Sequence, residues 1–158
     1  MINISTKADT LKSLDLVLKK SKIEKFFVFT ITEWKNKKKE IIDIIKQEFP
    51  LCKIVIRSSA ISEDTLEDSM AGSFKSILNV NPKSTEEVLS AVDNVINSYK
   101  HKLAESSFNQ ILVQKQTEDI AICGVIFTRS PEKNSPYYII NYDDTTGHTH
   151  TVTAGIEN

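Results

Sequence analysis

Apolar residues recur at helical spacing in three segments, which predicts three amphipathic helices. The first is expected over residues 6–20, the second from about residue 31 to the stop at Pro50, and the third from about residue 85. In each, a Ser or Thr precedes an acidic residue by three positions, the spacing of a helix-capping pair. The pairs are Thr6 with Asp9, Thr30 with Glu33, and Ser84 with Glu87. The apolar positions are Leu11, Leu14, Val17 and Leu18; Ile41, Ile42, Ile45 and Phe49; and Val88, Val92, Val95, Ile96, Tyr99 and Leu103.

Short β-branched or alternating runs predict strands between and after these helices. The expected strands cover residues 26–29, 54–56, 73–80, 110–116, 122–128 and 137–142, with a further one at 147–155. In the run 73–80 the alternation places Phe74, Ser76, Leu78 and Val80 on one side. The helices lie in the first part of the chain, and the second half is rich in strands. This order predicts a mixed α/β domain of the α+β class rather than a doubly wound parallel sheet.

Composition limits the classes of function. The 158 residues suit one domain of ordinary size, and 40% hydrophobic with 26% charged residues is normal for a globular protein. A net charge of −1 gives no overall basic field for nucleic acid, and no apolar run approaches a membrane span. The first residues lack the pattern of a secretory signal, so a cytoplasmic protein is expected. Cys52 and Cys123 lie in apolar runs and are expected to be buried thiols.

The basic residues are almost all lysines. Arg57 and Arg129, the only arginines, each follow a predicted strand. An arginine side chain is a rigid, permanently charged fork that suits phosphate or carboxylate, although chance placement explains either position equally well. The basic cluster near the start of the second helix is interpreted as a solvated face, with a nucleic-acid patch as the minor alternative. It consists of Lys35, Lys37, Lys38 and Lys39.

A polar stretch from Arg57 to Gly72 follows the buried run 54–56 directly. A strand end fixes the position of a ligand-binding side chain while the following loop leaves it accessible. Arginine beside two serines, and small residues near Gly72, suit contacts with phosphoryl oxygens. An ordinary polar connection between two strands explains the same composition, and the residues alone leave both interpretations open.

Four segments, in order, resemble the N-terminal ATP-binding domain of the phosphoenolpyruvate synthase and pyruvate phosphate dikinase family. The longest covers residues 54–64 and 69–80, with Ile-Val-Ile-Arg-Ser-Ser-Ala-Ile-Ser-Glu-Asp followed by Ser-Met-Ala-Gly-Ser-Phe-Lys-Ser-Ile-Leu-Asn-Val. The others are Ser-Thr-Lys-Ala-Asp-Thr-Leu at 5–11, Gln-Ile-Leu-Val-Gln at 110–114 and Gly-Val-Ile-Phe-Thr-Arg-Ser-Pro at 124–131. The resemblance implies the front part of an ATP-grasp-like nucleotide-binding domain over residues 1–158.

The resemblance also implies roles for particular residues. Lys7 would contact the phosphates, and Arg57 would hold the transferred or β-phosphate. Ala71, Gly72 and Ser73 would close over the phosphates with backbone N–H groups. Val113, through its backbone, and Gln114, through its amide, would meet the adenine. Thr128 and Arg129 are secondary candidates. Glu63 and Asp64 either orient Arg57 or cap a turn. Without the resemblance, Lys7 would be taken for an ordinary surface lysine.

The family passes a phosphoryl group from ATP to a histidine on a mobile domain and then to an acceptor, so ATP and Mg²⁺ are the expected cofactors. The metal ligands, a further adenine-side glutamine and the mobile domain belong to parts that these 158 residues do not contain. The isolated chain is therefore expected to bind ATP weakly and to show no turnover. The alternative is a freestanding nucleotide-binding or regulatory module without catalysis.

One segment departs from the family pattern. Where an acidic residue is expected after Gly147, the chain has His150, with His148 two positions earlier. This variant and the region around Trp34 are similar to a branch linked to surface-polysaccharide modification, some members of which resemble L-glutamine kinases. The expected acceptor is accordingly pyruvate or an amide such as L-glutamine, and no metal site is claimed for the two histidines.

Overall fold

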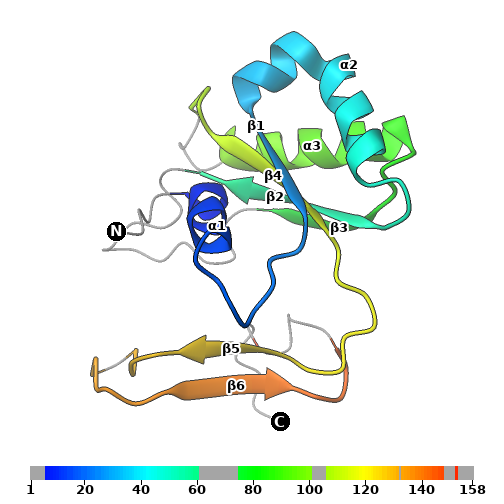
Figure 1. Ribbon diagram of the computed structural model, residues 1–158. Helices are drawn as coiled ribbons and strands as arrows, with labels where there is room; N and C mark the ends of the chain where they lie inside the picture. Colours follow the sequence, from blue (N-terminus) through cyan, green and yellow to red (C-terminus); the bar gives the residue numbers. More distant parts are fainter. Residues whose placement is uncertain (1–5, 61–74, 101–105, 132, 148–151, 153–158) are drawn as a thin grey trace. The chain divides into compact units, whose positions relative to one another are not determined.

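The structure, a computed structural model, describes residues 6–60, 75–100, 106–131, 133–147 and 152. These residues form three helices and two antiparallel sheets, which confirms the predicted α+β class with a strand-rich second half (Figure 1). The chain divides into two compact units, Met1–Gln116 and Thr117–Asn158. Each unit is described by itself below.

The first unit is built on a four-stranded sheet in the order β1-β4-β2-β3. Every neighbouring pair of strands is antiparallel, so β1 and β2 are parallel to each other with β4 between them. By the same argument β3 and β4 are parallel with β2 between them. Helices make the two crossover connections. The elements are α1 (Lys7–Asp15), β1 (Phe26–Thr30), α2 (Ile31–Glu48), β2 (Ile54–Ser59), β3 (Ser76–Val80), α3 (Thr85–Lys100) and β4 (Gln110–Lys115).

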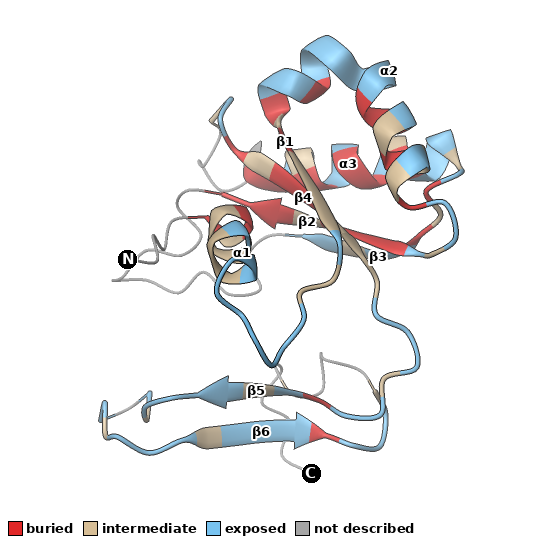
Figure 2. Cartoon of the chain, viewed as in Figure 1, coloured by how far each residue is buried: buried red, intermediate tan, exposed pale blue. Residues whose placement is uncertain are grey.

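The hydrophobic core lies between one face of this sheet and the two crossover helices. Alternate residues of the central strands, such as Ile54 and Ile56 of β2 and Ile111 and Val113 of β4, are fully buried in it. Ile45 of α2 belongs to the same cluster, as do Val88, Val92, Val95 and Tyr99 of α3, while Ile96 is partly buried against it and the predicted Leu103 lies outside the described residues. Figure 2 shows the buried residues concentrated on β2, β4 and the inner sides of the helices, with the outer side of α2 exposed.

Helix starts are the best predicted local features. The Thr30 hydroxyl accepts from the Glu33 N–H, and the Glu33 carboxylate accepts from the Thr30 N–H, so the expected capping box at α2 is confirmed. Thr6 caps α1, and Ser84 accepts from the Glu87 N–H before α3. Within the described residues, the Glu87 carboxylate accepts from Asn81 N, whereas a reciprocal bond to Ser84 is not formed.

Two predictions about local structure are wrong. Helix α1 ends at Asp15 instead of residue 20, and Leu16, Val17 and Leu18 are exposed, because no described element buries them. In β3, Leu78 is 59% exposed although Val80 is buried, so the expected alternation fails. The register against β2 slips by one residue between Ile54 and Ile56, and Asn79 has a φ of 60°, which identifies a β-bulge.

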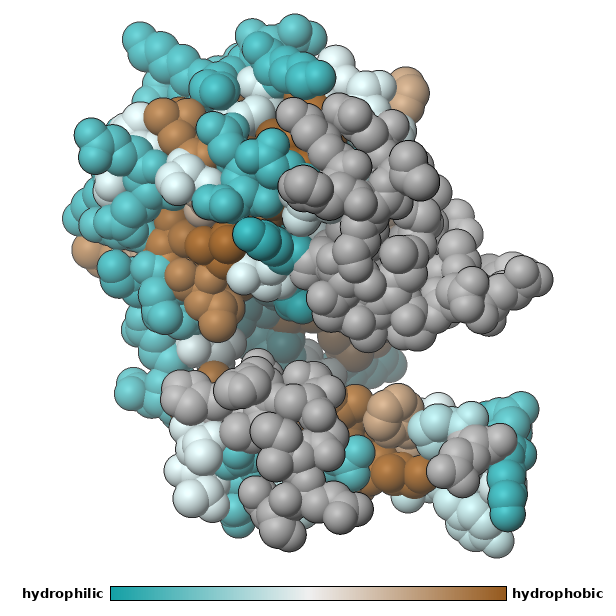
Figure 3. Space-filling view, turned by 180° about the vertical axis from the view of Figure 1, so that it is seen from behind, coloured by the Kyte–Doolittle hydropathy of each residue, from teal (hydrophilic) through white to brown (hydrophobic). Residues whose placement is uncertain are grey.

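The second unit contains a two-stranded antiparallel hairpin of β5 (Cys123–Phe127) and β6 (Ile139–Asp143). A Cβ on Gly124 would lie 2.5 Å from the backbone oxygen of Asn141, so the close approach of the strands requires glycine there. One face of the hairpin carries Ile122, Ile126, Tyr138, Ile140 and Tyr142, each more than half exposed. Figure 3 shows the apolar side chains of this unit at the surface.

The two cysteines are free, with Cys123 buried and Cys52 half-buried. Of the predicted strand at 147–155, only Gly147 and Val152 fall within the described residues, and neither lies in a strand. No helix in the described part of the chain is long and apolar enough to cross a membrane.

Candidate functional site

The sheet of the first unit has a second face, opposite the core, which carries two of the candidate residues, Arg57 and Gln114. Because side chains alternate along a strand, the neighbours of the core residues point to this face. We call it the α1 face, since the start of α1 packs against it through Ser59 and Gln110. Cross-strand register aligns Arg57 with Leu112, Val55 with Gln114, and Ser59 with Gln110 on this face. The α1 face consists of Val28, Val55, Arg57, Ser59, Gln110, Leu112 and Gln114.

Arg57 lies near the middle of the α1 face, on β2 between Leu112 of β4 and Ser76 of β3. Its side chain is half-buried. Among the residues that the structure describes, no hydrogen bond or ion pair engages the guanidinium. A partly buried cation is stabilised by an anionic partner, and the guanidinium fork matches two phosphoryl or carboxylate oxygens at once. The surroundings of Arg57 therefore favour an anionic ligand.

Lys7 is the first residue of α1, between Thr6 and Ala8. The Ala8 N–H donates to the hydroxyl of Ser59 at 3.0 Å, and the Asp9 N–H donates to the hydroxyl of Thr6 at 3.1 Å. Two of the N–H groups that a helix start offers to anions are thus already used. A phosphate contact at this position would depend on the ammonium group of Lys7 rather than on the helix end.

A buried hydroxyl connects the ends of the two central strands. Tyr99 of α3 has no exposed surface; its Oη accepts from the Ser59 N–H at 2.8 Å and donates to the Gln110 carbonyl at 2.6 Å. Ser59 and Gln110 are register partners, so the hydroxyl bridges the last rung between β2 and β4. The side chain of Tyr99 thereby holds the end of β2, two residues after Arg57, in place. Sequence reasoning placed Tyr99 in the core but missed this hydrogen-bonding role, because the spacing of apolar residues does not show which groups the tyrosine hydroxyl contacts.

Of the two predicted adenine contacts, only Gln114 places its side chain on the α1 face. Its amide nitrogen lies 3.5 Å from the carbonyl oxygen of Glu24. The side chain of Val113 is fully buried in the core, and the backbone of β4 is paired with β1 on one side and β2 on the other. The backbone contact of Val113 with adenine that the resemblance implies stays a prediction.

Several sequence-derived candidates fall outside the described residues. They are Glu63, Asp64, Ala71, Gly72, Ser73, His148 and His150. Arg129 lies in the second unit, where its guanidinium donates to the Asn134 carbonyl at 3.1 Å across its own turn. The structure thus places Arg57 and Gln114 on the α1 face and Lys7 at the start of the helix that packs against it.

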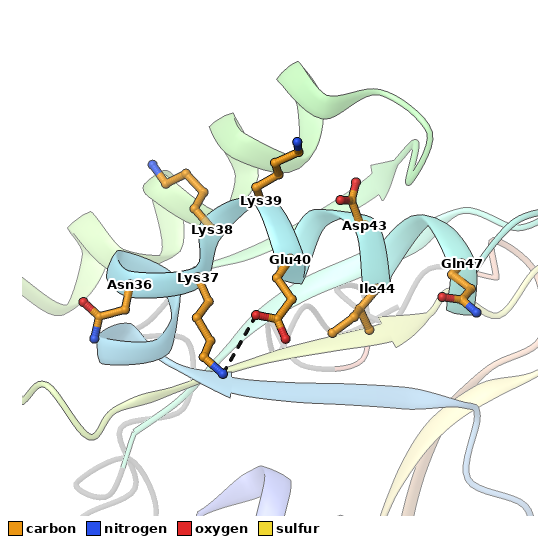
Figure 4. A pocket seen from close by; sticks show the side chains of 8 residues that line it. All are labelled: Asn36, Lys37, Lys38, Lys39, Glu40, Asp43, Ile44 and Gln47. Carbon is orange, nitrogen blue, oxygen red and sulfur yellow. Dashed lines mark ion pairs between the residues drawn. The ribbon is translucent and has the colours of Figure 1, made fainter.

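A surface hollow of about 520 Å³ lies elsewhere, along α2. Figure 4 shows that every side chain lining it projects from this one helix, with Lys37 paired to Glu40 at 3.9 Å. The hollow coincides with the kink of α2 at Lys37. It contains no residue of the α1 face and no side chain from a second element. We therefore do not assign the candidate site to it.

No group of three or more His, Cys, Asp or Glu side chains within the described ranges is arranged to hold a metal ion. A magnesium ion bound together with a nucleotide needs only one or two protein carboxylates, so the Mg²⁺ that the resemblance implies stays an expectation.

Comparison with known proteins agrees with the sequence motifs. A search of curated proteins finds no match to the chain. The family described as "Pyruvate phosphate dikinase, AMP/ATP-binding domain" matches residues 30–147, well over half of the chain. The match includes Arg57, the central strands and the hairpin of the second unit. The chain therefore belongs to the family of the AMP/ATP-binding domain of pyruvate phosphate dikinase.

Proposed function

We propose that the chain is the front part of the ATP-binding domain of a phosphotransferase. In this proposal the complete enzyme transfers a phosphoryl group from ATP to a histidine on another domain, and from there to a small acceptor. Family membership supports ATP as the nucleotide. The histidine relay rests on the resemblance described above, as does an acceptor such as pyruvate or an amide like L-glutamine.

The observation that carries the proposal is the half-buried guanidinium of Arg57, without a described partner, at the centre of the α1 face. An ATP polyphosphate supplies the paired anionic oxygens that such a group accommodates. In phosphoryl transfer, positioning the phosphates and neutralising their charge account for most of the catalysis. We therefore assign Arg57 to the β-phosphate or the transferred phosphate.

The other proposed contacts surround Arg57. Lys7 contributes a second positive charge, from a backbone position next to the Ala8–Ser59 hydrogen bond. Gln114 lies on the same face, one strand over and nearer the other end of β2, and offers its amide to the adenine. Ala71, Gly72 and Ser73 remain part of the proposal as the loop over the phosphates, on the motif alone.

Titration of the isotope-labelled 158-residue chain with ATP, followed by NMR, tests the proposal even when binding is weak. Arg57→Ala is expected to weaken ATP binding by roughly 10- to 100-fold, the equivalent of a charge-assisted hydrogen bond. Lys39→Ala is the control, because it removes an exposed positive charge from α2, which packs on the opposite face of the sheet. Equal effects of the two substitutions, or the absence of saturable shifts in the wild-type chain, would contradict the proposal.

A further inference from the structure

Ser59, at the end of β2, connects three segments that are distant in the sequence. Its hydroxyl oxygen accepts from the Ala8 N–H at 3.0 Å and lies 3.4 Å from the side-chain oxygen of Gln110. That same Gln110 oxygen lies 2.9 Å from the hydroxyl of Thr6. Thr6, Ala8 and Ser59 are each at most 3% exposed. The start of α1 is therefore attached to the end of β2 by a buried hydrogen bond and to the start of β4 by a partly buried one.

This attachment fixes the residue between Thr6 and Ala8, which is Lys7. Both neighbours of Lys7 are held by the Ser59–Gln110 pair, so the backbone of Lys7 has little freedom relative to the sheet. Ser59 lies two residues beyond Arg57 on the same face of β2, a separation of roughly 7 Å along a strand. Ser59 thus fixes the distance between the backbone of Lys7 and the backbone of Arg57.

The hydrogen bonds of Ser59 exceed what the fold of the sheet alone requires. Its backbone N–H is already satisfied by Tyr99, so the strand end is closed without the side chain. The hydroxyl adds only the link to α1 and Gln110. Ser58, the adjacent buried serine, points to the opposite face of the sheet and is not part of this link.

Resting on the proposed function, we propose that Ser59 is a positioning residue for the phosphates of ATP. By holding the start of α1 on the strand that carries Arg57, its hydroxyl sets the ammonium of Lys7 at the spacing needed to contact phosphates beside the one bound by Arg57. Ser59 itself does not touch the nucleotide in this proposal. The effect of losing its hydroxyl should therefore depend on the presence of Lys7 and of the phosphates.

The test compares the binding of ATP and of adenosine by NMR titration of folded variants of the whole chain. Ser59→Ala is expected to weaken ATP binding roughly fivefold, about the net contribution of one hydrogen bond, and to leave adenosine binding unchanged. Ser59→Thr, which keeps the hydroxyl, should restore ATP binding. In a Lys7→Ala background, Ser59→Ala should have no additional effect on ATP, because the group that Ser59 positions is gone.

Ser58→Ala is the matched control, since it removes a neighbouring buried hydroxyl from the other face; it should not change the ratio of ATP to adenosine affinity. If Ser59→Ala does not fold, Gln110→Met replaces it, because it removes the amide contacts to Thr6 and Ser59 at similar volume, with the same expected result.

An equal loss of ATP affinity with and without Lys7, or identical effects of the Ser58 and Ser59 variants, would overturn the inference. ATP binding that depends on Arg57 but not on Ser59 refutes this inference alone, whereas no ATP binding by the wild-type chain refutes the proposed function as well.

Discussion

Tyr99→Phe is predicted to destabilise the first unit strongly although it removes a single oxygen atom. That oxygen accepts from the Ser59 N–H at 2.8 Å and donates to the Gln110 carbonyl at 2.6 Å. Tyr99 and Ser59 have no exposed surface, so water cannot replace the bond from the Ser59 N–H, whereas the bond to the carbonyl of the half-buried Gln110 is partly buried. A buried polar group left without a partner costs about 1–3 kcal/mol. The Ser59 N–H bears this cost in full and the partly buried Gln110 carbonyl bears part of it, so the expected loss is about 2–4 kcal/mol. This is a large part of the 5–15 kcal/mol that typically stabilises a domain.

Urea denaturation followed by circular dichroism measures this loss as a shift in midpoint at constant slope. Amide hydrogen exchange at Ser59 should accelerate in the same variant, which locates the effect at the strand end. Tyr138→Phe is the control, because Tyr138 is 73% exposed and its substitution should change stability by less than about 0.5 kcal/mol. If Tyr99→Phe lowers the free energy of unfolding by no more than the control does, the last rung between β2 and β4 does not depend on the hydroxyl, and the bridging role is refuted.

Two further predictions concern the hairpin and the start of α2. Gly124→Ala should destabilise the β5–β6 pairing by about 1–3 kcal/mol, because the new Cβ meets backbone atoms of Asn141 and Tyr142; unchanged amide exchange in both strands would contradict this. The backbone N–H and hydroxyl of Thr30 lower the pKa of Glu33 below its ordinary value of 4.5, so its contribution to stability is present above that pH and is lost as the pH falls through the lowered pKa. The stability difference between the wild type and Glu33→Gln should therefore shrink in acid, and NMR titration of Glu33 should give a midpoint below 4.5; a midpoint at or above it would contradict the capping geometry.

Local sequence patterns predicted the elements of this fold well because their causes are local. Capping pairs located the starts of the helices, and the stripe of α3 corresponds to its buried positions as far as Tyr99. The pattern was wrong where a distant partner decides the outcome. Leu16 to Leu18 continue the stripe of α1, yet no described element covers them. At the β-bulge, Asn79 forms two hydrogen bonds with the side chain of Gln116, 37 residues away, which periodicity does not show.

The candidate site was accessible from the sequence only through motif resemblance. From the residues alone, Arg57 could equally have belonged to an ordinary polar loop after a strand. Lys7 could have been an ordinary surface lysine. The structure adds the common face on which Arg57 and Gln114 lie, because strand order and register are set by long-range pairing, and it places Lys7 at the start of the helix that packs against this face. It also separates Gln114 from Val113, since adjacent residues of a central strand point to opposite faces. The positioning role of Ser59 required the contacts themselves.

The central claim is that ATP binds on the α1 face of the first unit, with its phosphates at Arg57. The most direct test is to map the chemical-shift changes that ATP causes in the labelled chain. The account predicts saturable shifts at the Arg57 side-chain N–H and at the amides of Ala8, Ser59 and Gln114, which diminish from ATP through ADP to AMP for the phosphate-side groups. Shifts confined to the hollow along α2 between Asn36 and Gln47, or no shifts at all, would contradict it.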